Sequence, residues 1–205
     1  MSALSSYEIK QITYKQAMDV VVKNHYLHRK APCSIAFGLF LNDELKGVIC
    51  YGTPSSAPLR KGIAGEENIN NVIELTRLWI DDSVPKNGES FLIGNTLKKS
   101  GKEIVVSYAD TEQNHLGIVY QATNFYYTGL SAKRTNWTIE GIDKHCQTIA
   151  DKYTSKEIRE MYGEKFSLKP RSRKHRYVFI NAKKQRKKQL LSQLKYPIFE
   201  YPKKC

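Results

Sequence analysis

Four polar residues, Ser107, Asp110, Thr111 and His115, lie at or just beyond the end of an apolar run at 103–109. Open α/β sheets place their sites at the carboxyl ends of central strands, so this cluster is a candidate site. Asp110 is the predicted general base or orienting acid, because a carboxylate accepts a proton from a reacting group. Ser107 is a candidate for binding the substrate or the donor. An alternative interpretation, in which Asp110 only caps a helix or a turn, stays open.

A second candidate is Arg77, which interrupts the apolar run Val72–Ile80. In a regularly alternating strand, Arg77 points to the face opposite Glu74. It then lies beside Leu75 and Trp79, where a guanidinium is costly unless it meets an anion. That anion is either part of a bound substrate or donor, or an internal carboxylate, and both interpretations stay open.

Two histidines three residues apart, His25 and His28, flank Tyr26 just after a predicted helix at 14–24. On one helical face the two imidazoles would share a metal ion, with Tyr26 or a distant carboxylate as a further ligand. The alternative interpretation is an exposed helix end, since this spacing is common by chance.

Tyr120 lies in the segment 117–122, which is followed by a second aromatic segment at 125–129. Tyrosine rings stack on a base that has been extruded from a nucleic acid, and their hydroxyls form hydrogen bonds with it. Tyrosines are also routine core residues, so this segment by itself leaves both roles open.

The elements that must position these residues alternate in type along the chain. Strands are predicted at 7–12, 35–41, 45–51, 72–80, 103–109, 131–140 and 176–181. Helices are predicted at 14–24, 91–99, 116–124 and 183–195, with part of 143–162 also helical and 52–65 a loop. A hairpin sheet followed by two strand–helix units predicts an α/β (α+β) protein with a mixed central sheet flanked by helices. This order resembles the GNAT acetyltransferase fold.

The GNAT resemblance implies a turn after the fourth strand that holds a pyrophosphate at a helix N-terminus, where free N–H groups favour anions. The equivalent turn here contains Lys86, Asn87 and Gly88, which are candidates for binding the donor. The turn departs from the usual Gln/Arg-x-x-Gly-x-Gly/Ala pattern, and Glu89 puts an acid where a phosphate would lie.

The net charge of +13 is confined to the C-terminal fifth of the chain. From Lys165 to Cys205 there are fourteen Lys or Arg and one acidic residue, whereas the first 164 residues are neutral overall. Such a segment binds polyanions by counterion release, and its interleaved aromatic residues favour nucleic acid over a membrane surface or a solvated tail. The predicted contacts are Arg171, Arg173, Lys174, Arg176, Lys183, Lys184, Arg186, Lys187 and Lys188. This division predicts a catalytic domain at 1–182 and a basic extension at 183–205.

The four cysteines, Cys33, Cys50, Cys146 and Cys205, lack metal-type spacing, which indicates reduced thiols. No charged-then-apolar leader opens the chain, and no run approaches the ~20 apolar residues of a membrane span. We therefore expect a cytoplasmic protein without a membrane partner.

Several motifs together resemble the Mom family of phage DNA-modification proteins. They are Val72–Trp79, Pro85–Leu92, Ser107–Asp110 and Tyr120–Ala122, and the similarity covers about residues 20–180, including His25-Tyr26 and Arg173–Tyr177. The resemblance implies a transferase that places a carbamoylmethyl (glycinamide-type) group on adenine N6 in double-stranded phage DNA and so protects it from host restriction. It implies catalytic roles for His25, Tyr26, Ser90, Asp110 and Tyr120, and a binding role for Arg77. It also implies acetyl-CoA or another acyl donor, and iron with His25 as a ligand.

The transferred group has two carbons and an amide nitrogen, which are the atoms of a glycine residue. Acetyl-CoA does not supply that nitrogen, so glycyl-tRNA is an alternative donor and tRNA an additional partner. In the expected mechanism the basic end binds the phosphate backbone while an adenine is flipped into a pocket near Asp110. Two other functions stay open: a GNAT-type acetyltransferase acting on protein or RNA, and a non-catalytic nucleic-acid-binding protein.

Overall fold

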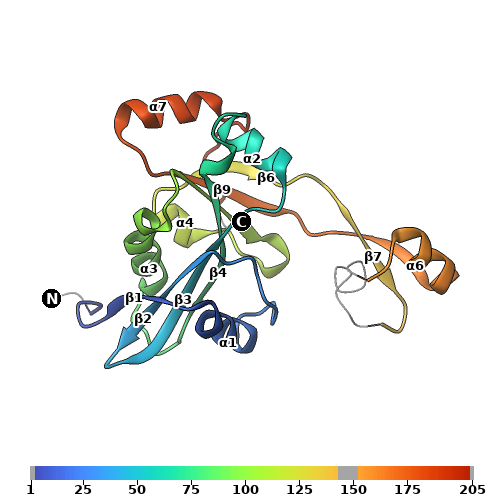
Figure 1. Cartoon of the computed structure of the whole chain (residues 1–205), viewed down its shortest axis with the longest axis horizontal. Coiled ribbons are helices and arrows are strands. Elements are labelled where there is room, and N and C mark those ends of the chain that lie inside the picture. The colour runs from blue at the N-terminus through green and yellow to red at the C-terminus, as the bar shows by residue number, and fades with distance from the viewer. Residues whose placement is uncertain (1–2, 143–151, 204–205) are drawn as a thin grey trace.

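The computed structural model describes residues 3–142 and 152–203, and its body is a seven-stranded sheet (Figure 1). The strand order is β1-β2-β3-β4-β5-β9-β6. Only β4 and β5 are parallel, and the other neighbours are antiparallel, so the expected mixed sheet is confirmed. The strands are β1 (Glu8–Ile12), β2 (Ile35–Leu41), β3 (Glu44–Gly52), β4 (Val72–Ile80), β5 (Ile104–Asp110), β6 (Tyr126–Leu130) and β9 (Lys174–Ile180).

Helices cover both faces of this sheet. On one face lie α1 (Tyr14–Asn24), α2 (Ala57–Ala64) and α7 (Lys184–Gln193), and on the other lie α3 (Gly88–Thr96) and α4 (Ile118–Ala122). Short 3-10 turns occupy Ile69–Asn71, Leu97–Ser100, Thr111–Gln113 and Gly163–Lys165. Helix α2 corrects the expectation of a loop at 52–65: Ser56 caps it, accepting a hydrogen bond from the Leu59 N–H.

An extra residue in β4 changes the faces of its side chains. Strand β3 pairs Cys50 with Arg77 and Tyr51 with Leu75, so Thr76 is the additional residue of a β-bulge. The Thr76 hydroxyl donates a hydrogen bond shared between the carbonyls of Pro32, at 2.9 Å, and Cys50, at 3.2 Å.

Because of the bulge, Glu74 and Arg77 share one face, and the regular alternation expected from the sequence is wrong. Glu74 lies between Ile73 and Leu75, whose side chains pack in the core beneath α3 and α4. It therefore points to the opposite face. Arg77 pairs with Cys50, which packs beneath α1 on that same face.

Strands β4 and β5 pair over only three residues, Val72–Glu74 with Ile104–Val106. Beyond them the two strands separate, and the Ser107 hydroxyl donates to the Leu75 carbonyl at 3.2 Å. The separation leaves an opening at the carboxyl ends of the two parallel strands, which is where open α/β sheets place their ligands.

The C-terminal segment packs onto the body of the protein. Leu190 of α7 is fully buried among Ile63, Ala64 and Val178, and the Phe199 N–H donates to the Tyr127 carbonyl at 2.9 Å. The predicted division between a catalytic domain at 1–182 and a basic extension at 183–205 therefore stays a prediction about the roles of the two segments. Deleting this segment would expose part of the core and would not serve as a test of function.

An arm between β6 and β9 projects from the body (Figure 1). It consists of the antiparallel strands β7 (Thr135–Ile139) and β8 (Phe166–Pro170) with helix α6 (Ser155–Tyr162). Its small core is built on Ile139 and Ile158. The strand predicted at 131–140 thus lies outside the central sheet, while β6 and β8 were not predicted.

Of the helix predicted within 143–162, residues 155–162 form α6, and residues 143–151 lie outside the described residues, as do Cys146 and Cys205. Cys33 and Cys50 are free thiols. Within the described part of the chain, no helix has the length and apolar character needed to cross a membrane.

Candidate active site

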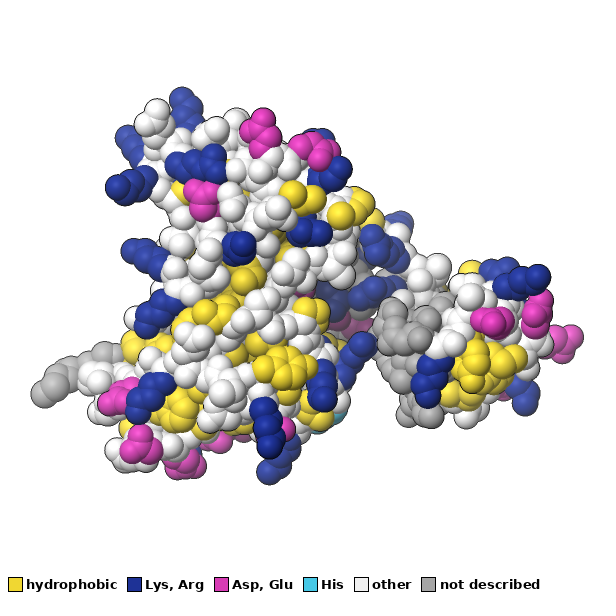
Figure 2. Space-filling view, in the orientation of Figure 1, with side chains coloured by type: hydrophobic (Ala, Val, Ile, Leu, Met, Phe, Trp, Pro, Cys, Tyr) yellow, Lys and Arg dark blue, Asp and Glu magenta, His cyan; other side chains and the backbone are white. Residues whose placement is uncertain are grey.

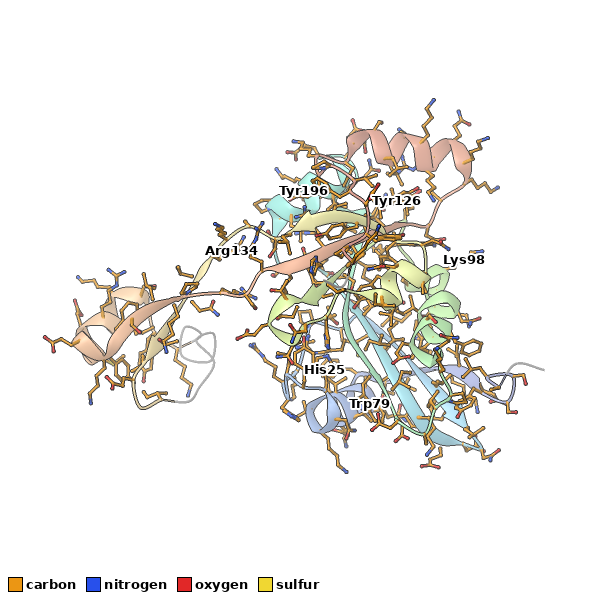
Figure 3. All side chains as sticks on the ribbon, turned by 180° about the vertical axis from the view of Figure 1, so that it is seen from behind. His25, Trp79, Lys98, Tyr126, Arg134 and Tyr196 are labelled. Atoms are coloured by element: carbon orange, nitrogen blue, oxygen red, sulfur yellow. The ribbon has the colours of Figure 1, made fainter. Side chains whose placement is uncertain are left out.

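A pocket of about 1360 Å³ occupies the opening between β4 and β5. Its walls bring together residues from the end of α1, both strands, the start of α4, the base of the arm and the C-terminal segment. Figure 3 shows His25 near the end of α1, Tyr196 beside α2 and Arg134 where the arm begins. Of the predicted site residues, the pocket contains His25, Tyr26, Arg77, Tyr120, Arg171, Lys174 and Arg176.

His25 is a neutral imidazole on this wall. Its Nδ1 accepts a hydrogen bond from the Leu27 N–H at 3.2 Å, which places the proton on Nε2. Burial, followed by the nearby positive charge of Arg77, lowers the pKa of His25 to about 4. His25 therefore offers an N–H donor at neutral pH.

Tyr26 forms an aromatic edge to the pocket with two imidazoles. Its ring stacks on His25 with centroids 4.4 Å apart, and it meets His115 edge to face at 5.9 Å. Tyr26 is 43% exposed, so one side of this edge is free to receive a planar ligand.

Glu74, which the sequence interpretation did not select, is one of two carboxylates that line the pocket, and the other is Glu89. Burial raises its pKa to about 7, even though Lys174 and Arg77 act in the opposite direction. A carboxylate with this pKa accepts and returns protons near neutral pH, as a general base must. A single acid inside the apolar run Val72–Ile80 was the signal that would have identified it.

Arg77 lies on the same face with little internal compensation. One of its terminal nitrogens donates to the Thr76 carbonyl at 2.6 Å, whereas its Nε is buried without a hydrogen-bond partner. No carboxylate forms an ion pair with Arg77 among the described residues. Of the two interpretations of Arg77, this geometry favours a ligand anion.

Asp110 is tied to the base of the arm. It forms an ion pair with Lys174 at 3.1 Å and accepts a hydrogen bond from the Glu112 N–H at 3.1 Å. Burial by itself would raise the pKa of Asp110, but hydrogen bonds from Ser172 and Glu112 and the ion pair outweigh it, so the pKa is lowered. A stabilised carboxylate is a weak base, so the geometry favours a positioning role for Asp110.

This arrangement predicts the effect of Asp110→Asn. Loss of the ion pair leaves Lys174 to interact with Glu74 and lowers the pKa of that carboxyl. If the chain modifies DNA, as the motif resemblance implies, we expect the acid limb of the pH–rate profile to move down by up to about one unit, with DNA affinity nearly unchanged. The measurement is turnover between pH 5 and 9, set beside DNA binding. A collapse of affinity together with activity would assign Asp110 a purely structural role.

Ser107 and Tyr120 lie on the α3–α4 side of the opening. Burial raises the pKa of Tyr120 to about 12, although a hydrogen bond with Ser107 acts in the opposite direction. Tyr120 is therefore protonated at neutral pH and donates rather than accepts a proton. Ser107 is fully buried and does not line the pocket. It can therefore influence a ligand only by positioning neighbouring residues such as Tyr120.

The turn before α3 lies away from the residues around the main pocket. Lys86, Asn87 and Ser90 line a second cavity of about 700 Å³ between α3 and α4, and the Ser90 hydroxyl donates to the Asn87 carbonyl at 3.0 Å. Gly88 is required by packing, because a Cβ there would lie 2.6 Å from a methyl of Val84. The structure thus does not bring Ser90 to the predicted catalytic residues.

The same turn does not fit the pyrophosphate of acetyl-CoA. In the first turn of α3, the side that lines the main pocket carries Glu89, and an acid there repels a phosphate. The one cation of the turn, Lys86, lines the second cavity instead.

The described residues do not assemble an iron site either. Among residues 3–142 and 152–203, no three His, Cys, Asp or Glu side chains come together. His25 Nδ1 is already hydrogen-bonded, and His28 Nδ1 donates to the Val22 carbonyl at 3.2 Å. The expected sharing of one metal by the two imidazoles therefore has no support, and we derive no step through iron.

The basic residues predicted to bind nucleic acid divide into two groups. Arg176 is buried, with hydrogen bonds to the Thr128 hydroxyl and carbonyl and its guanidinium 3.4 Å from the centroid of the Tyr196 ring. It therefore forms pocket wall and cannot serve as a surface phosphate contact. Arg173, Lys174 and Arg186 are held by internal partners, and Lys187 is partly covered over the Tyr126 ring. Arg171, Lys183, Lys184 and Lys188 are exposed, and their role stays a prediction.

Solved structures resemble this chain in fold, and a characterised protein resembles it in sequence. A protein assigned as a phosphinothricin N-acetyltransferase superimposes with a TM-score of 0.50 and 11% identity, covering 87% of this chain and 100% of that one. An N-acetyltransferase from Staphylococcus aureus Mu50 gives a TM-score of 0.49 and 12% identity, with coverage of 87% and 100%. The first likeness confirms the GNAT-like fold expected from the order of the elements.

The methylcarbamoylase Mom of Escherichia phage Mu is 32% identical over 125 residues, which are 58% of this chain and 48% of that protein. The chain thus spans about half the length of this relative. The sequence pattern of the Mom protein family matches residues 6–203, a range that contains every residue of the pocket wall. The resemblance seen in the motifs is therefore confirmed, and the chain belongs to the Mom protein family.

Proposed function

We propose that this protein is a transferase that modifies the N6 amino group of adenine in DNA. The observation that carries the proposal is a pocket at the strand opening of a GNAT-like sheet that joins a carboxyl group of pKa about 7, Glu74, to an uncompensated guanidinium, Arg77. The relation to a methylcarbamoylase supports DNA as the substrate.

The chemistry explains why these two groups belong together. Adenine N6 is a weak nucleophile because its lone pair is delocalised into the ring. As N6 attacks an activated carbonyl it loses a proton, and Glu74 is the base that accepts it. Negative charge develops on the carbonyl oxygen, and the guanidinium of Arg77, which lines the pocket, donates to it.

The tyrosines divide the remaining roles. Tyr26, stacked on His25, forms the aromatic edge against which a flipped adenine rests. Tyr120 holds its proton at neutral pH and donates it to the leaving group. Asp110 positions Lys174 and the base of the arm.

For the donor, we propose a glycyl ester such as glycyl-tRNA. Attack of N6 on the glycyl carbonyl forms an amide and breaks the ester bond, so that the carrier leaves as an alcohol with a proton from Tyr120. The glycyl amine then attacks C6 of adenine through a five-membered ring, and the original C6–N6 bond breaks. The product carries CH2–C(O)NH2 on the nitrogen now attached to C6, with no oxidant or reductant required.

Two measurements test the proposal. Plasmid DNA from cells that express the chain should contain an adenine nucleoside heavier by C2H3NO, and unmodified DNA would contradict the proposed reaction. In that case acetylation of protein or RNA, or binding without catalysis, would account for the fold.

The donor is tested separately by growing the cells with labelled glycine. We expect both glycine carbons and its nitrogen in the modified base, with that nitrogen attached to C6. If the modified base forms and contains neither label, the glycyl donor is excluded while the transferase proposal stands.

A further inference from the structure

The arm has one face whose charged side chains are all cationic. Successive residues of a strand point to opposite faces, and Ile139 and Phe166 pack in the small core with α6. The register places the alternate residues on the other face, which we call the ribbon face. It consists of Arg134, Asn136 and Thr138 opposite Arg171, Lys169 and Ser167.

The ribbon face is regular and uncompensated in charge. The Arg171 N–H donates to the Arg134 carbonyl at 2.8 Å, and the hydroxyls of Thr138 and Ser167 are 2.9 Å apart. Neither 131–139 nor 165–174 contains an acidic residue. Arg134, Lys169 and Arg171 are exposed, and no acid of the described residues forms an ion pair with them.

The ribbon face continues the wall of the pocket outward. Arg134 and Arg171 line the pocket at the base of the arm, and Lys169 lies two residues farther out. Figure 2 shows Lys and Arg side chains gathered where the arm joins the body. The Arg173 guanidinium donates to the Ser131 carbonyl at 2.7 Å, which holds the two segments of the base together.

We propose that the ribbon face docks onto the double-stranded DNA that flanks the adenine in the pocket, with Arg134, Lys169 and Arg171 on phosphates. This inference rests on the proposed function. From residue 134 to residue 139 the ribbon extends roughly 17 Å, and the three cations lie within its inner ~7 Å. They therefore meet phosphates at one edge of a major groove about 12 Å wide, and the uncharged outer part of the ribbon enters the groove. B-form DNA admits a two-stranded ribbon in that groove, whereas the major groove of A-form RNA is too deep and narrow, so the geometry favours DNA over a tRNA.

The test compares two triple variants of the full chain. One is Arg134→Ala with Lys169→Ala and Arg171→Ala. The matched control removes three exposed cations from the turn after α3, Lys98, Lys99 and Lys102, with Lys98 lying on the side away from the arm (Figure 3). Affinity is measured by fluorescence anisotropy on a labelled duplex of about 30 base pairs, roughly three helical turns, over a range of salt concentrations.

We expect the ribbon variant to lose at least roughly tenfold in affinity, and its plot of log affinity against log salt to be less steep by about two to three units. The control should keep both values. Lys169→Glu is a second variant outside the pocket, and it should weaken binding with circular dichroism unchanged.

Each other outcome has a distinct meaning. If the wild-type chain binds and modifies DNA while the ribbon variant binds equally well, the inference is overturned. A ribbon variant that loses affinity only for a structured RNA would overturn it in favour of an RNA partner. If the wild-type chain neither binds DNA nor yields modified adenine, the proposed function itself has failed.

Discussion

Glu74→Gln is expected to lower the turnover of adenine modification by roughly 10²- to 10⁴-fold, which is the usual contribution of a general base. The amide keeps the shape of the side chain but cannot accept the proton from N6. Because the active form of Glu74 is the carboxylate and its pKa is about 7, wild-type turnover should rise as the pH increases through 7. That limb of the pH–rate profile should be absent from the variant.

The same substitution should stabilise the protein at alkaline pH. The pKa of Glu74 is higher in the folded chain than in the unfolded chain, so between about pH 4.5 and 7 the folded state holds a proton that the unfolded state has lost. Stability therefore falls as the pH rises through this window, by up to roughly 3 kcal/mol. The glutamine side chain does not ionise, so the variant avoids the free-energy cost of a buried carboxylate. The melting temperature of Glu74→Gln should therefore exceed the wild-type value at pH 8 but not at pH 4.

Glu103→Gln is the matched control. Glu103 lies outside the pocket and forms an ion pair with Arg186 at 2.7 Å, which lowers its pKa. Its substitution should reduce stability slightly and leave turnover intact. If Glu74→Gln retained full turnover and the rise in turnover through pH 7, Glu74 would not be the base.

Arg77→Ala is the second variant with a large expected effect, a loss of about 10²- to 10³-fold in kcat/KM. The variant loses the guanidinium that lines the pocket and that we propose stabilises the developing oxyanion. Arg77→Lys should not restore activity, because a compact ammonium cannot reproduce the fork of a guanidinium. Added guanidinium ion should restore part of the activity of the alanine variant.

Two further measurements separate this role from a structural one. Arg77 contributes to the low pKa of His25, so the His25 titration followed by NMR should move to higher pH in Arg77→Ala. Arg60 also has a buried Nε without a partner, but it lies outside the pocket. Arg60→Ala should therefore leave kcat/KM unchanged, and an equal loss in both arginine variants would contradict the assignment.

Local pattern was sufficient for most of the sheet and for the ends of its elements. The helix predicted at 14–24 and the strands predicted at 35–41 and 72–80 have the bounds seen in the structure. The capping residue Thr13 and the apolar spacing of Ala17, Met18 and Val21 specify α1 within a few residues of sequence. The order of these elements was enough to identify the GNAT-like fold.

The errors arose where pairing between distant segments overrides the local pattern. Regular alternation placed Glu74 and Arg77 on opposite faces, but the register with β3 inserts Thr76 as a bulge and brings them together. The aromatic segment around Tyr126 pairs with β9, some fifty residues away, and so became a strand of the central sheet. Neither pairing has a signature within the segment itself.

The site shows the same division. Sequence motifs selected His25, Tyr26, Arg77 and Tyr120, and the structure places all four around one pocket. The motifs also selected Asp110 as the base, because a carboxylate at a strand end has that chemistry. Its partner Lys174 lies on another strand, and only the contact between them shows that the Asp110 carboxylate is already paired with a cation.

The charged C-terminal fifth shows which properties the sequence determines and which the tertiary structure determines. The sequence by itself determined the family, the order of the elements and a cationic C-terminal fifth, because these depend on residue type and local spacing. Only the tertiary structure decided that Arg176 is pocket wall, that Glu74 has a pKa near 7 and that Arg134 joins Lys169 and Arg171 on one ribbon face. Burial, electrostatic interaction and strand pairing depend on distances between residues far apart in the chain, and the folded backbone alone sets those distances.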